Sequence, residues 1–423
     1  MEGFFHLSDL VSQKPEIDIP KCGRCKLKNF CKSPMIPTKE GNRPILIIGP
    51  PPSKTEDMNG KWMSGDSGEM LKETLADLGS PAYSYIGSLI CKPKNLTKPI
   101  RAIGEHIKDC RANIFNQVKQ QKPIVVILLG DLAVKSFIGG IWKKDLGSNN
   151  MEKWYGWQIP LYKYKCYVIP TYSPRDILED DKNQIKRNLF VSHLKSAVRL
   201  ARQNDYSPIV EKHKKLTLLK KRIELIYEPK EVKRFIEKMS EAKITAFDYE
   251  TTCKKPEYKG AQIVSCSISD GKETAAFPFV YVKTIQSIKR QFRDYLHSTH
   301  TGKIGSNIKF EDRWSNHFFQ ERGIVRGWKF DTMLGAHFYD CRRGITGLKF
   351  QAFVQLGVLT YDDAVSQFLS ADESKGNKIN RIMDDVSMEK LLTYNAEDSL
   401  YEWHLAKELT KLTGLYDSVF KGD

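Results

Sequence analysis

Ile244-Thr245-Ala246-Phe247-Asp248-Tyr249-Glu250-Thr251 is an apolar stretch that runs into two carboxylates, and it predicts a buried strand with an acidic end. Alternate residues of a strand point to the same side, so Asp248 and Glu250 can face one point in space. Two like charges held together repel unless a cation lies between them, and Mg²⁺ prefers carboxylate oxygens. The pair alone is a weak signal, because solvated strand ends often carry such residues.

Two later segments strengthen this signal. The segment Gly305–Asp312 supplies Glu311 and Asp312 after a short strand. Near the end of the chain, Tyr394 and Asp398 are four residues apart, which places both on one face of a helix. Asp248, Glu250, the Glu311–Asp312 pair, Tyr394 and Asp398 occur in this order along the chain. Together they indicate a metal site far more specifically than any one of them does alone. A helix predicted at 231–239 and strands predicted at 262–269 and 274–279 indicate an α/β domain around it.

The front half of the chain predicts a second α/β domain. The apolar run Arg43–Gly49 is typical of a buried parallel strand. Further strands are expected at 83–90, 124–129 and 166–169, and they alternate with helices at 68–78 and 100–120. This alternation predicts a parallel sheet covered by helices, with ligands at the carboxyl ends of the strands.

Length and charge suggest two domains and a polyanionic partner. The chain has 423 residues, and 67 Lys and Arg against 51 Asp and Glu give a net charge of +16. The excess lies before residue 235, since residues 235–423 are balanced, which suggests a nucleic acid partner. A basic surface without a partner is the alternative. We expect domains at 1–205 and 223–423, joined by a polar, basic linker at 206–222. No membrane span or secretory signal is recognisable, so a soluble cytoplasmic protein is expected.

Nine cysteines are present, and five fall within the first 110 residues. An odd number in an intracellular chain argues against a disulfide framework. Cys22 and Cys25 form a Cys-x-x-Cys pair, Cys91 follows a predicted strand, and Cys110 lies on the next predicted helix. By itself the pair is ambiguous between zinc, a redox dithiol and an iron–sulfur cluster.

Residues 222–415 resemble the 3′–5′ exonuclease domain of family A DNA polymerases, the DEDDy nucleases. Asp248 with Glu250 match its first motif, Tyr394 with Asp398 match its third, and Phe330–Leu334 and Gly347–Lys349 match further stretches. In the second motif the family places an aspartate directly after the aromatic residue. Here Glu311 holds that place and Asp312 follows it; either could be the ligand, and motif position favours Glu311.

This resemblance implies a ribonuclease H-like fold and two divalent ions, Mg²⁺ or Mn²⁺, at the scissile phosphate. Asp248 would bridge the ions, and Glu250, Asp398 and Glu311 or Asp312 would complete their shells. Tyr394 would orient the attacking water, and the product would be a nucleoside 5′-monophosphate. Asn307 either orders its turn or contacts nucleic acid.

Residues 15–200 resemble the iron–sulfur, family 4 uracil-DNA glycosylases, which have a three-layer fold around a parallel sheet. The four cysteines at 22, 25, 91 and 110 match the ligands of the family's 4Fe–4S cluster. The loop Gly60–Gly65 resembles the family's Gly-x-Pro-Phe-Val-Gly loop. Lys54, Lys61 and Arg175 are candidate phosphate contacts; the alternative is that they are ordinary surface residues.

The residues of the expected pocket depart from that family. Pro50 stands where the family has a catalytic glutamate, Met63 where it has a stacking phenylalanine, and Ser88 where it has the uracil-reading asparagine. The late His-Pro-Ser motif is Ser173-Pro174-Arg175, without the histidine. We therefore expect a domain that binds DNA without excising uracil, with an altered base specificity as the alternative.

The tandem order resembles the N-terminal part of certain bacteriophage family A DNA polymerases, in which a polymerase domain follows. The chain would then be a split subunit, an independent exonuclease or a truncated product, found in the host cytoplasm if phage-encoded. The leading hypothesis is a metal-dependent, proofreading 3′–5′ DNA exonuclease, with a separate polymerase subunit as a candidate partner. Alternatives are a non-catalytic DNA-binding or polymerase-assembly module and an RNA-trimming exonuclease.

Overall fold

The structure is a computed structural model that describes residues 21–38, 43–93, 100–142, 151–205, 207–371 and 378–421. The chain divides into two compact units, Met1–Tyr206 and Ser207–Asp423, which are described separately below. Among the described helices, none combines the length and the apolar character that a membrane crossing requires.

The first unit is built on a five-stranded sheet in the order β2-β1-β3-β5-β4. The first four strands of this order are parallel, as the alternating pattern predicts, and β4 pairs antiparallel with β5. The strands are β1 (Ile45–Gly49), β2 (Tyr83–Gly87), β3 (Val125–Leu129), β4 (Ile159–Leu161) and β5 (Cys166–Thr171). The helices are α1 (Cys22–Cys25), η2 (Leu27–Asn29), α2 (Lys54–Asn59), α3 (Asp66–Asp77), α4 (Ile100–Gln121), α5 (Gly130–Ile141), η3 (Met151–Trp154), η4 (Tyr162–Tyr164), α6 (Pro174–Glu179) and α7 (Gln184–Gln203).

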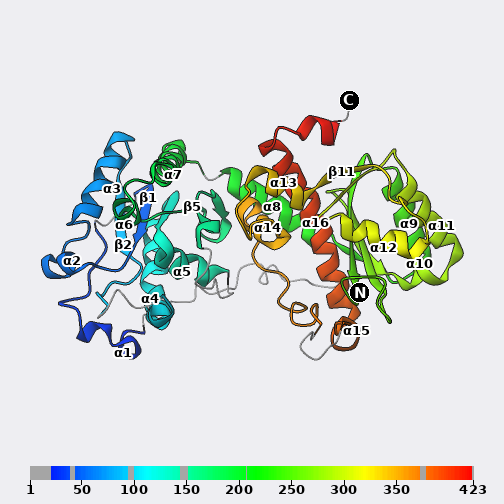
Figure 1. The fold of residues 1–423 in the computed structure, drawn as a ribbon, viewed down its shortest axis with the longest axis horizontal. Helices are drawn as coiled ribbons and strands as arrows, with labels where there is room; N and C mark the ends of the chain where they lie inside the picture. The colour runs from blue at the N-terminus through cyan, green and yellow to red at the C-terminus, as the bar shows by residue number, and fades with distance from the viewer. Residues whose placement is uncertain are drawn as a thin grey trace, which may run out of the picture. The chain divides into compact units, whose positions relative to one another are not determined.

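Helices cover both faces of this sheet (Figure 1). On one face, Ile45 and Ile47 of β1 pack with Leu71 of α3 and with Phe190 and Leu194 of α7. On the other face, α4 and α5 contact β1 and each other. All five residues of β1 are buried, which explains why the strand is a continuous apolar run.

The second unit contains a six-stranded mixed sheet in the order β11-β10-β7-β8-β9-β6. Strand β8 runs antiparallel to β7 and β9, and the other pairings are parallel. The strands are β6 (Glu224–Leu225), β7 (Ile244–Thr251), β8 (Ile263–Ser269), β9 (Thr274–Pro278), β10 (Gly302–Gly305) and β11 (Trp328–Asp331). The helices are α8 (Ser207–Lys221), α9 (Pro229–Ser240), α10 (Val280–Thr284), α11 (Gln286–His297), α12 (Lys309–Phe319), α13 (Thr332–Tyr339), α14 (Leu348–Leu356), α15 (Ile382–Asp385), α16 (Met388–Leu412) and η6 (Asp417–Lys421).

The two faces of the second sheet have different partners. Phe247 and Tyr249 of β7 pack with Val232 of α9 and Phe292 of α11 in the main core. On the opposite face, α16 contacts β7, β8 and β9 (Figure 1). Because side chains alternate along a strand, Asp248 and Glu250 lie on the face that α16 covers.

Residues 207–221, where composition predicts a linker, instead form α8 within the second unit. Leu219 packs with Ala352, Leu400 and Tyr401, and the Nζ of Lys220 lies 2.8 Å from a carboxylate oxygen of Glu397. The helix buries Ile209, Leu216 and Leu219 and exposes Lys214, Lys215, Lys220 and Lys221, so average composition conceals it.

Candidate active site

Three carboxylates of the second unit converge at one point. Asp248 and Glu250 of β7 and Asp398 of α16 each offer an oxygen within 4.8 Å of the others. Across the described part of the chain, no other group of three such ligand atoms is this close. The spacing of two residues in the strand and the position of Asp398 on the covering helix produce the convergence.

Asn395 fixes α16 against β7, which carries Asp248 and Glu250, and against the neighbouring strand β8. Its Nδ2 donates to Oδ2 of Asp248 at 2.7 Å, while its Oδ1 accepts from Ser265 Oγ at 2.9 Å. Its backbone carbonyl accepts from Ser267 Oγ at 2.7 Å. Asn395 is fully buried, so these bonds set the register of the helix on β7 and β8.

Lys349, at the start of α14, reaches the same cluster. Its Nζ donates to Oδ1 and Oδ2 of Asp398 at 2.8 and 2.7 Å, and to the Tyr394 hydroxyl at 2.6 Å. The hydroxyl of Tyr361 also donates to Oδ1 of Asp398, at 2.5 Å. Tyr394 and Asp398 therefore lie side by side, as their spacing predicts. Sequence reasoning missed Tyr361 and assigned no role to Lys349.

Two more carboxylates approach the cluster from α12 and α16. Glu311 is 2% exposed and Glu402 is 1% exposed. In the described structure, Oε2 of each is buried without a hydrogen-bond partner. Asp312 is different, because its Oδ2 accepts from Asn316 Nδ2 at 2.8 Å along α12. Glu402 was missed by sequence reasoning, although it follows Asp398 at the same four-residue spacing.

Burial and mutual repulsion perturb these groups. Burial first, and then the charge of Asp398, raise the pKa of Asp248 well above its usual range. Burial and neighbouring carboxylates, including Asp248, likewise raise the pKa of Glu250, Glu311 and Glu402. Clustered, partly unpartnered carboxylate oxygens are the donor set that a hard divalent cation binds, so the residues fit such an ion.

Asn307 lies in the turn before α12. It is exposed, has a φ of +67°, and its backbone N–H donates to Oδ1 of Asp331 at 3.0 Å. The carboxylate of Asp331 also accepts from the backbone N–H groups of Ile308, Met333 and Leu334. Asp331 thus joins the start of α13 to the loop before α12, which carries Glu311.

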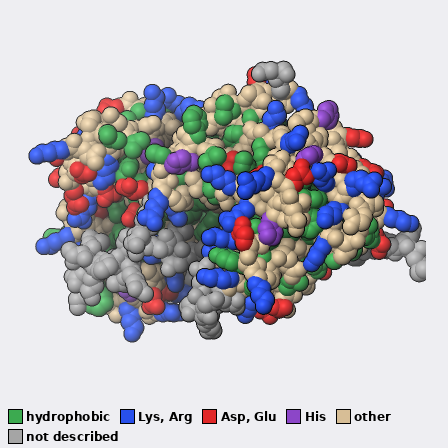
Figure 2. Space-filling view, turned by 45° about the vertical axis from the view of Figure 1, so that its right-hand side comes forward, with side chains coloured by type: hydrophobic (Ala, Val, Ile, Leu, Met, Phe, Trp, Pro, Cys, Tyr) green, Lys and Arg blue, Asp and Glu red, His purple; other side chains and the backbone are tan. Residues whose placement is uncertain are grey.

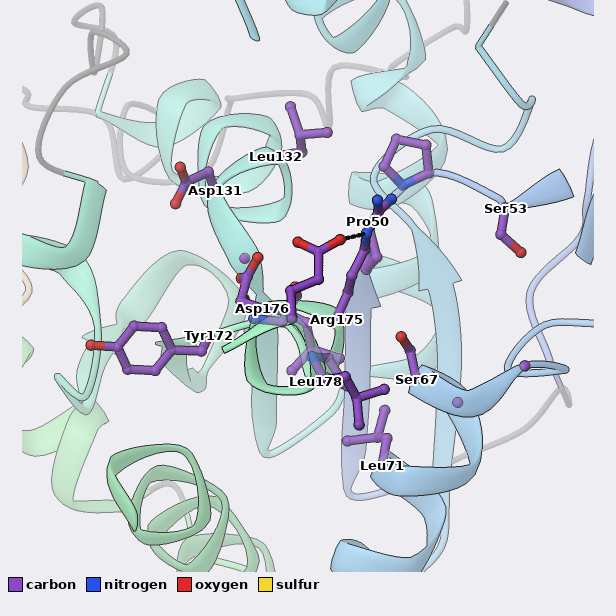
Figure 3. A pocket seen from close by; sticks show the side chains of 18 of the residues that line it. Pro50, Ser53, Ser67, Leu71, Asp131, Leu132, Tyr172, Arg175, Asp176 and Leu178 are labelled. Carbon is purple, nitrogen blue, oxygen red and sulfur yellow. Dashed lines mark hydrogen bonds and ion pairs between the residues drawn. The ribbon is translucent and has the colours of Figure 1, made fainter. Parts of the chain in front are cut away.

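The first unit has a cavity of about 990 Å³ at the carboxyl ends of its strands. Figure 3 shows Asp131, Tyr172 and Asp176 on one side of it and Ser53, Ser67 and Leu71 on the other. Carboxylates outnumber cations in its lining: Glu56, Asp66, Asp131, Glu152, Asp176 and Glu179 against Arg175 and Lys186.

Several of these polar groups bond to the backbone of the pocket itself. Oε1 of Glu56 accepts from the N–H of Met63 at 2.7 Å, which holds Met63 at a φ of +56°. Glu56 also forms a capping box with Ser53 at α2, and Ser173 forms one with Asp176 at α6. Tyr155 donates to Asp131 at 2.5 Å, and burial raises the pKa of Asp131.

The three expected phosphate contacts are exposed, but they do not form one site. Arg175 lines the cavity and pairs with Glu179 at 2.6 Å (Figure 3), whereas Lys54 and Lys61 are not part of the lining. Over the face in Figure 2, Lys and Arg side chains are interspersed with acidic ones.

The cysteines at 22, 25, 91 and 110 surround a small cavity of about 80 Å³ together with Leu27, Pro34, Leu89 and Ile90. Burial raises the pKa of Cys25, Cys91 and Cys110, so each needs a positive centre to remain a thiolate. Within the described ranges, no three cysteine sulfurs approach within 4.8 Å of one another. Four thiols around one small cavity are ligands that a zinc ion or an iron–sulfur cluster can use.

Sequence comparisons match the two units to different families. Residues 38–195 match the uracil DNA glycosylase superfamily, and residues 223–413 match a family described as 3′–5′ exonuclease. A type-4 uracil-DNA glycosylase of Saccharolobus solfataricus is 29% identical over 185 residues, covering 41% of this chain and 83% of that protein. One from Archaeoglobus fulgidus is 26% identical over 175 residues, covering 41% and 83%.

Structural comparison finds nucleases. The catalytic core of RRP6 from Trypanosoma brucei has a TM-score of 0.35 at 11% identity, covering 47% of this chain and 50% of that chain. Escherichia coli RNase D, an exoribonuclease, has a TM-score of 0.34 at 14% identity, covering 47% of each. This chain thus spans about half the length of these structures. Together, the two family matches show a fusion of a uracil DNA glycosylase superfamily domain with a 3′–5′ exonuclease domain.

Proposed function

We propose that this protein is a divalent-metal-dependent 3′–5′ DNA exonuclease of the proofreading type, which releases nucleoside 5′-monophosphates. The observation that carries the proposal is the convergence of Asp248, Glu250 and Asp398 within 4.8 Å. Such a group binds divalent ions and is costly to bury without them. Two ions bound there would supply the hydroxide nucleophile and stabilise the leaving 3′ oxygen.

Each protein group has a distinct role in this proposal. Asp248, Glu250 and Asp398 hold the cations, and Glu311, buried beside them, supports the second one. Asp312 stabilises α12 rather than a cation, because its carboxylate accepts a hydrogen bond from Asn316 one turn later. Burial and the charge of Asp398 raise the pKa of Tyr394 well above its usual range, so its phenol stays protonated and can orient a water.

The test is an end-labelled single-stranded DNA and a matched RNA, each incubated with the full chain and Mg²⁺ or Mn²⁺. Stepwise shortening of the DNA from its 3′ end, abolished by Asp248→Asn and retained by Asp312→Asn, is the expected result. Shortening of RNA alone would reassign the substrate. No shortening of either strand with Mn²⁺ present would refute the nuclease proposal.

We propose in addition that proofreading serves a separate polymerase, as the likeness to bacteriophage family A polymerases implies, in the cytoplasm where that polymerase works. The same assay with a mismatched primer terminus, with and without a candidate polymerase, tests this. Faster removal of a mismatched than of a matched end is expected. Equal rates under both conditions would contradict a proofreading role.

For the first domain, we propose DNA binding without uracil excision. Pro50 lines the cavity where a catalytic acid is expected, and a prolyl ring can neither transfer a proton nor orient water. Ser88 is fully buried, so a base in the cavity has little access to its hydroxyl. Uracil-containing DNA treated with the protein in chelator, which removes the divalent ions that the proposed exonuclease needs, and then with alkali should remain intact. Strand breaks that Ser173→Ala abolishes would overturn this proposal.

We further propose that Cys22, Cys25, Cys91 and Cys110 hold a 4Fe–4S cluster. Their spacing around an apolar cavity and the likeness to type-4 uracil-DNA glycosylases support it. The purified protein should absorb broadly near ~400 nm and contain about four iron atoms per chain. Stoichiometric zinc without iron would overturn the assignment.

A further inference from the structure

Lys349 places an ammonium group inside the carboxylate site. An ammonium has three N–H donors. The structure directs all three at the site: two contacts to the oxygens of Asp398, at 2.8 and 2.7 Å, and one to the hydroxyl of Tyr394, at 2.6 Å. The same Nζ lies 4.6 Å from the ring centre of Tyr394 and 5.3 Å from that of Tyr361. Aromatic faces attract cations, so the rings of Tyr394 and Tyr361 favour a positive charge at the position of this Nζ.

These contacts occupy the oxygens that a metal ion would use. Asp398 is 4% exposed, and its Oδ1 additionally accepts from Tyr361 at 2.5 Å. Both oxygens of Asp398 thus face hydrogen-bond donors. Oδ1 already accepts two hydrogen bonds, so a divalent cation that binds this oxygen has to displace Lys349 or Tyr361. At Oδ2 the cation would lie beside the ammonium of Lys349, and the two positive charges would repel each other.

The charges of the site make this competition strong. Asp248, Glu250 and Asp398 converge, and Glu311 and Glu402 are buried beside them with unpartnered oxygens. Five carboxylates and one ammonium leave four negative charges when all are ionised, which two divalent ions would neutralise. Lys349 contacts Asp398 at 2.7 Å, and its side chain is only one-quarter exposed. Its charge therefore acts through a poorly screened environment.

We propose that Lys349 is a resident counter-ion that occupies one cation position of the site until a divalent ion displaces it. The proposal rests on the proposed function, because it assumes that the carboxylates bind divalent ions. Metal loading is then an exchange of one cation for another. The lysine keeps the metal-free site folded and partly neutralised, and it weakens binding of the ion that must replace it.

The test measures Mn²⁺ binding to the full chain without nucleic acid. Titration calorimetry gives the affinity, and the electron paramagnetic resonance signal of free Mn²⁺ gives the amount left unbound. Binding that Asp248→Asn removes defines the site. Lys349→Met keeps the length of the side chain without its charge, and it should bind Mn²⁺ at least about tenfold more tightly than the wild type. Lys349→Arg keeps the charge and should retain weak binding.

Lys220→Met is the matched control. It also removes a lysine that pairs with a carboxylate of α16, but the partner is Glu397, at 2.8 Å. Its Mn²⁺ affinity should stay within about twofold of the wild type. Thermal unfolding supplies a second readout: without metal Lys349→Met should melt below the wild type, and its melting temperature should rise more than that of the wild type when Mn²⁺ is added.

The outcomes separate this inference from the proposed function. Unchanged or weaker Mn²⁺ binding by Lys349→Met, with normal binding by the wild type, would overturn the counter-ion alone. An absence of binding above the Asp248→Asn baseline in every variant would refute the metal site itself. If Lys349→Met does not fold without metal, Lys349→Gln titrated with Mn²⁺ gives the same comparison.

Discussion

Replacing Glu402 by glutamine should stabilise the metal-free protein, although glutamate is the native residue. Glu402 lies one helical turn after Asp398, is 1% exposed, and has an Oε2 atom without a partner in the described structure. Burial first, and then the charges of Asp248 and Glu311, raise its pKa well above the usual range. The amide has nearly the same shape and cannot ionise, so Glu402→Gln removes this cost.

The size of the effect follows from proton linkage. A carboxyl whose pKa is higher in the folded than in the unfolded protein loses stability as pH rises from the unfolded pKa towards the folded one. The loss is up to about 1.4 kcal/mol per pH unit. At pH 7.5 we expect Glu402→Gln to raise the free energy of unfolding by about 1–3 kcal/mol. For a unit of this size, each kcal/mol raises the melting temperature by about 2–4 °C.

Scanning calorimetry of the full chain in chelator measures the thermal unfolding of the second unit without bound metal. Glu408→Gln is the matched control on the same helix, because Lys212 at 3.2 Å and Lys411 at 3.4 Å hold Glu408 in its ionised form. Their charges lower the pKa of Glu408 despite its partial burial, so its neutralisation should destabilise the protein slightly. In excess Mg²⁺ the advantage of Glu402→Gln should vanish, since the ion stabilises the ionised wild type.

A lower melting temperature for Glu402→Gln in chelator would refute this reasoning. It would show that the Glu402 carboxylate has a favourable partner in the metal-free protein. A gain of equal size with and without Mg²⁺ would show that Glu402 does not act on a bound cation.

Other predictions concern the metal sites and pH. Asp248→Asn should lower the rate of 3′–5′ degradation by at least about 10³-fold, while its thermal stability in chelator should equal or exceed that of the wild type; a residual rate within tenfold would contradict this. Because burial and neighbouring charges raise the pKa of Glu250 and of the adjoining carboxyls, the metal-free second unit should lose stability from pH 5 to pH 8 in denaturant titrations. A stability that rises over this range would contradict the direction. Cys91→Ser should reduce iron content and absorbance near ~400 nm, whereas Cys166→Ser, a buried thiol outside the cysteine-lined cavity, should retain both; equal iron loss in the two variants would count against Cys91 as a ligand.

Local periodicity was sufficient to anticipate the parts of the site that lie within one element. The alternation of β7 places Asp248 and Glu250 on one side, and the helical repeat of α16 places Tyr394 beside Asp398. The alternation of apolar strands and helices likewise predicts the parallel sheet of the first unit, whose first four strands in spatial order are parallel.

Contacts between elements that are distant in the sequence could not be predicted from local periodicity. Lys349 is 49 residues and Tyr361 is 37 residues before Asp398, and neither spacing carries a periodic signal. The choice between Glu311 and Asp312 also depends on tertiary structure, because only the fold shows Asp312 bonded to Asn316. Glu402 could have been found, since it continues the four-residue repeat of Tyr394 and Asp398.

The position of α8 has a practical consequence for work on the second domain. A fragment cut at the start of the family match, residue 223, would lack this helix. It would uncover the apolar surface of Leu400 and Tyr401 and leave Glu397, one residue before Asp398, without Lys220. Solubility and stability measured on such a truncated fragment would reflect the cut as much as the enzyme, so an expression clone is better started at Ser207.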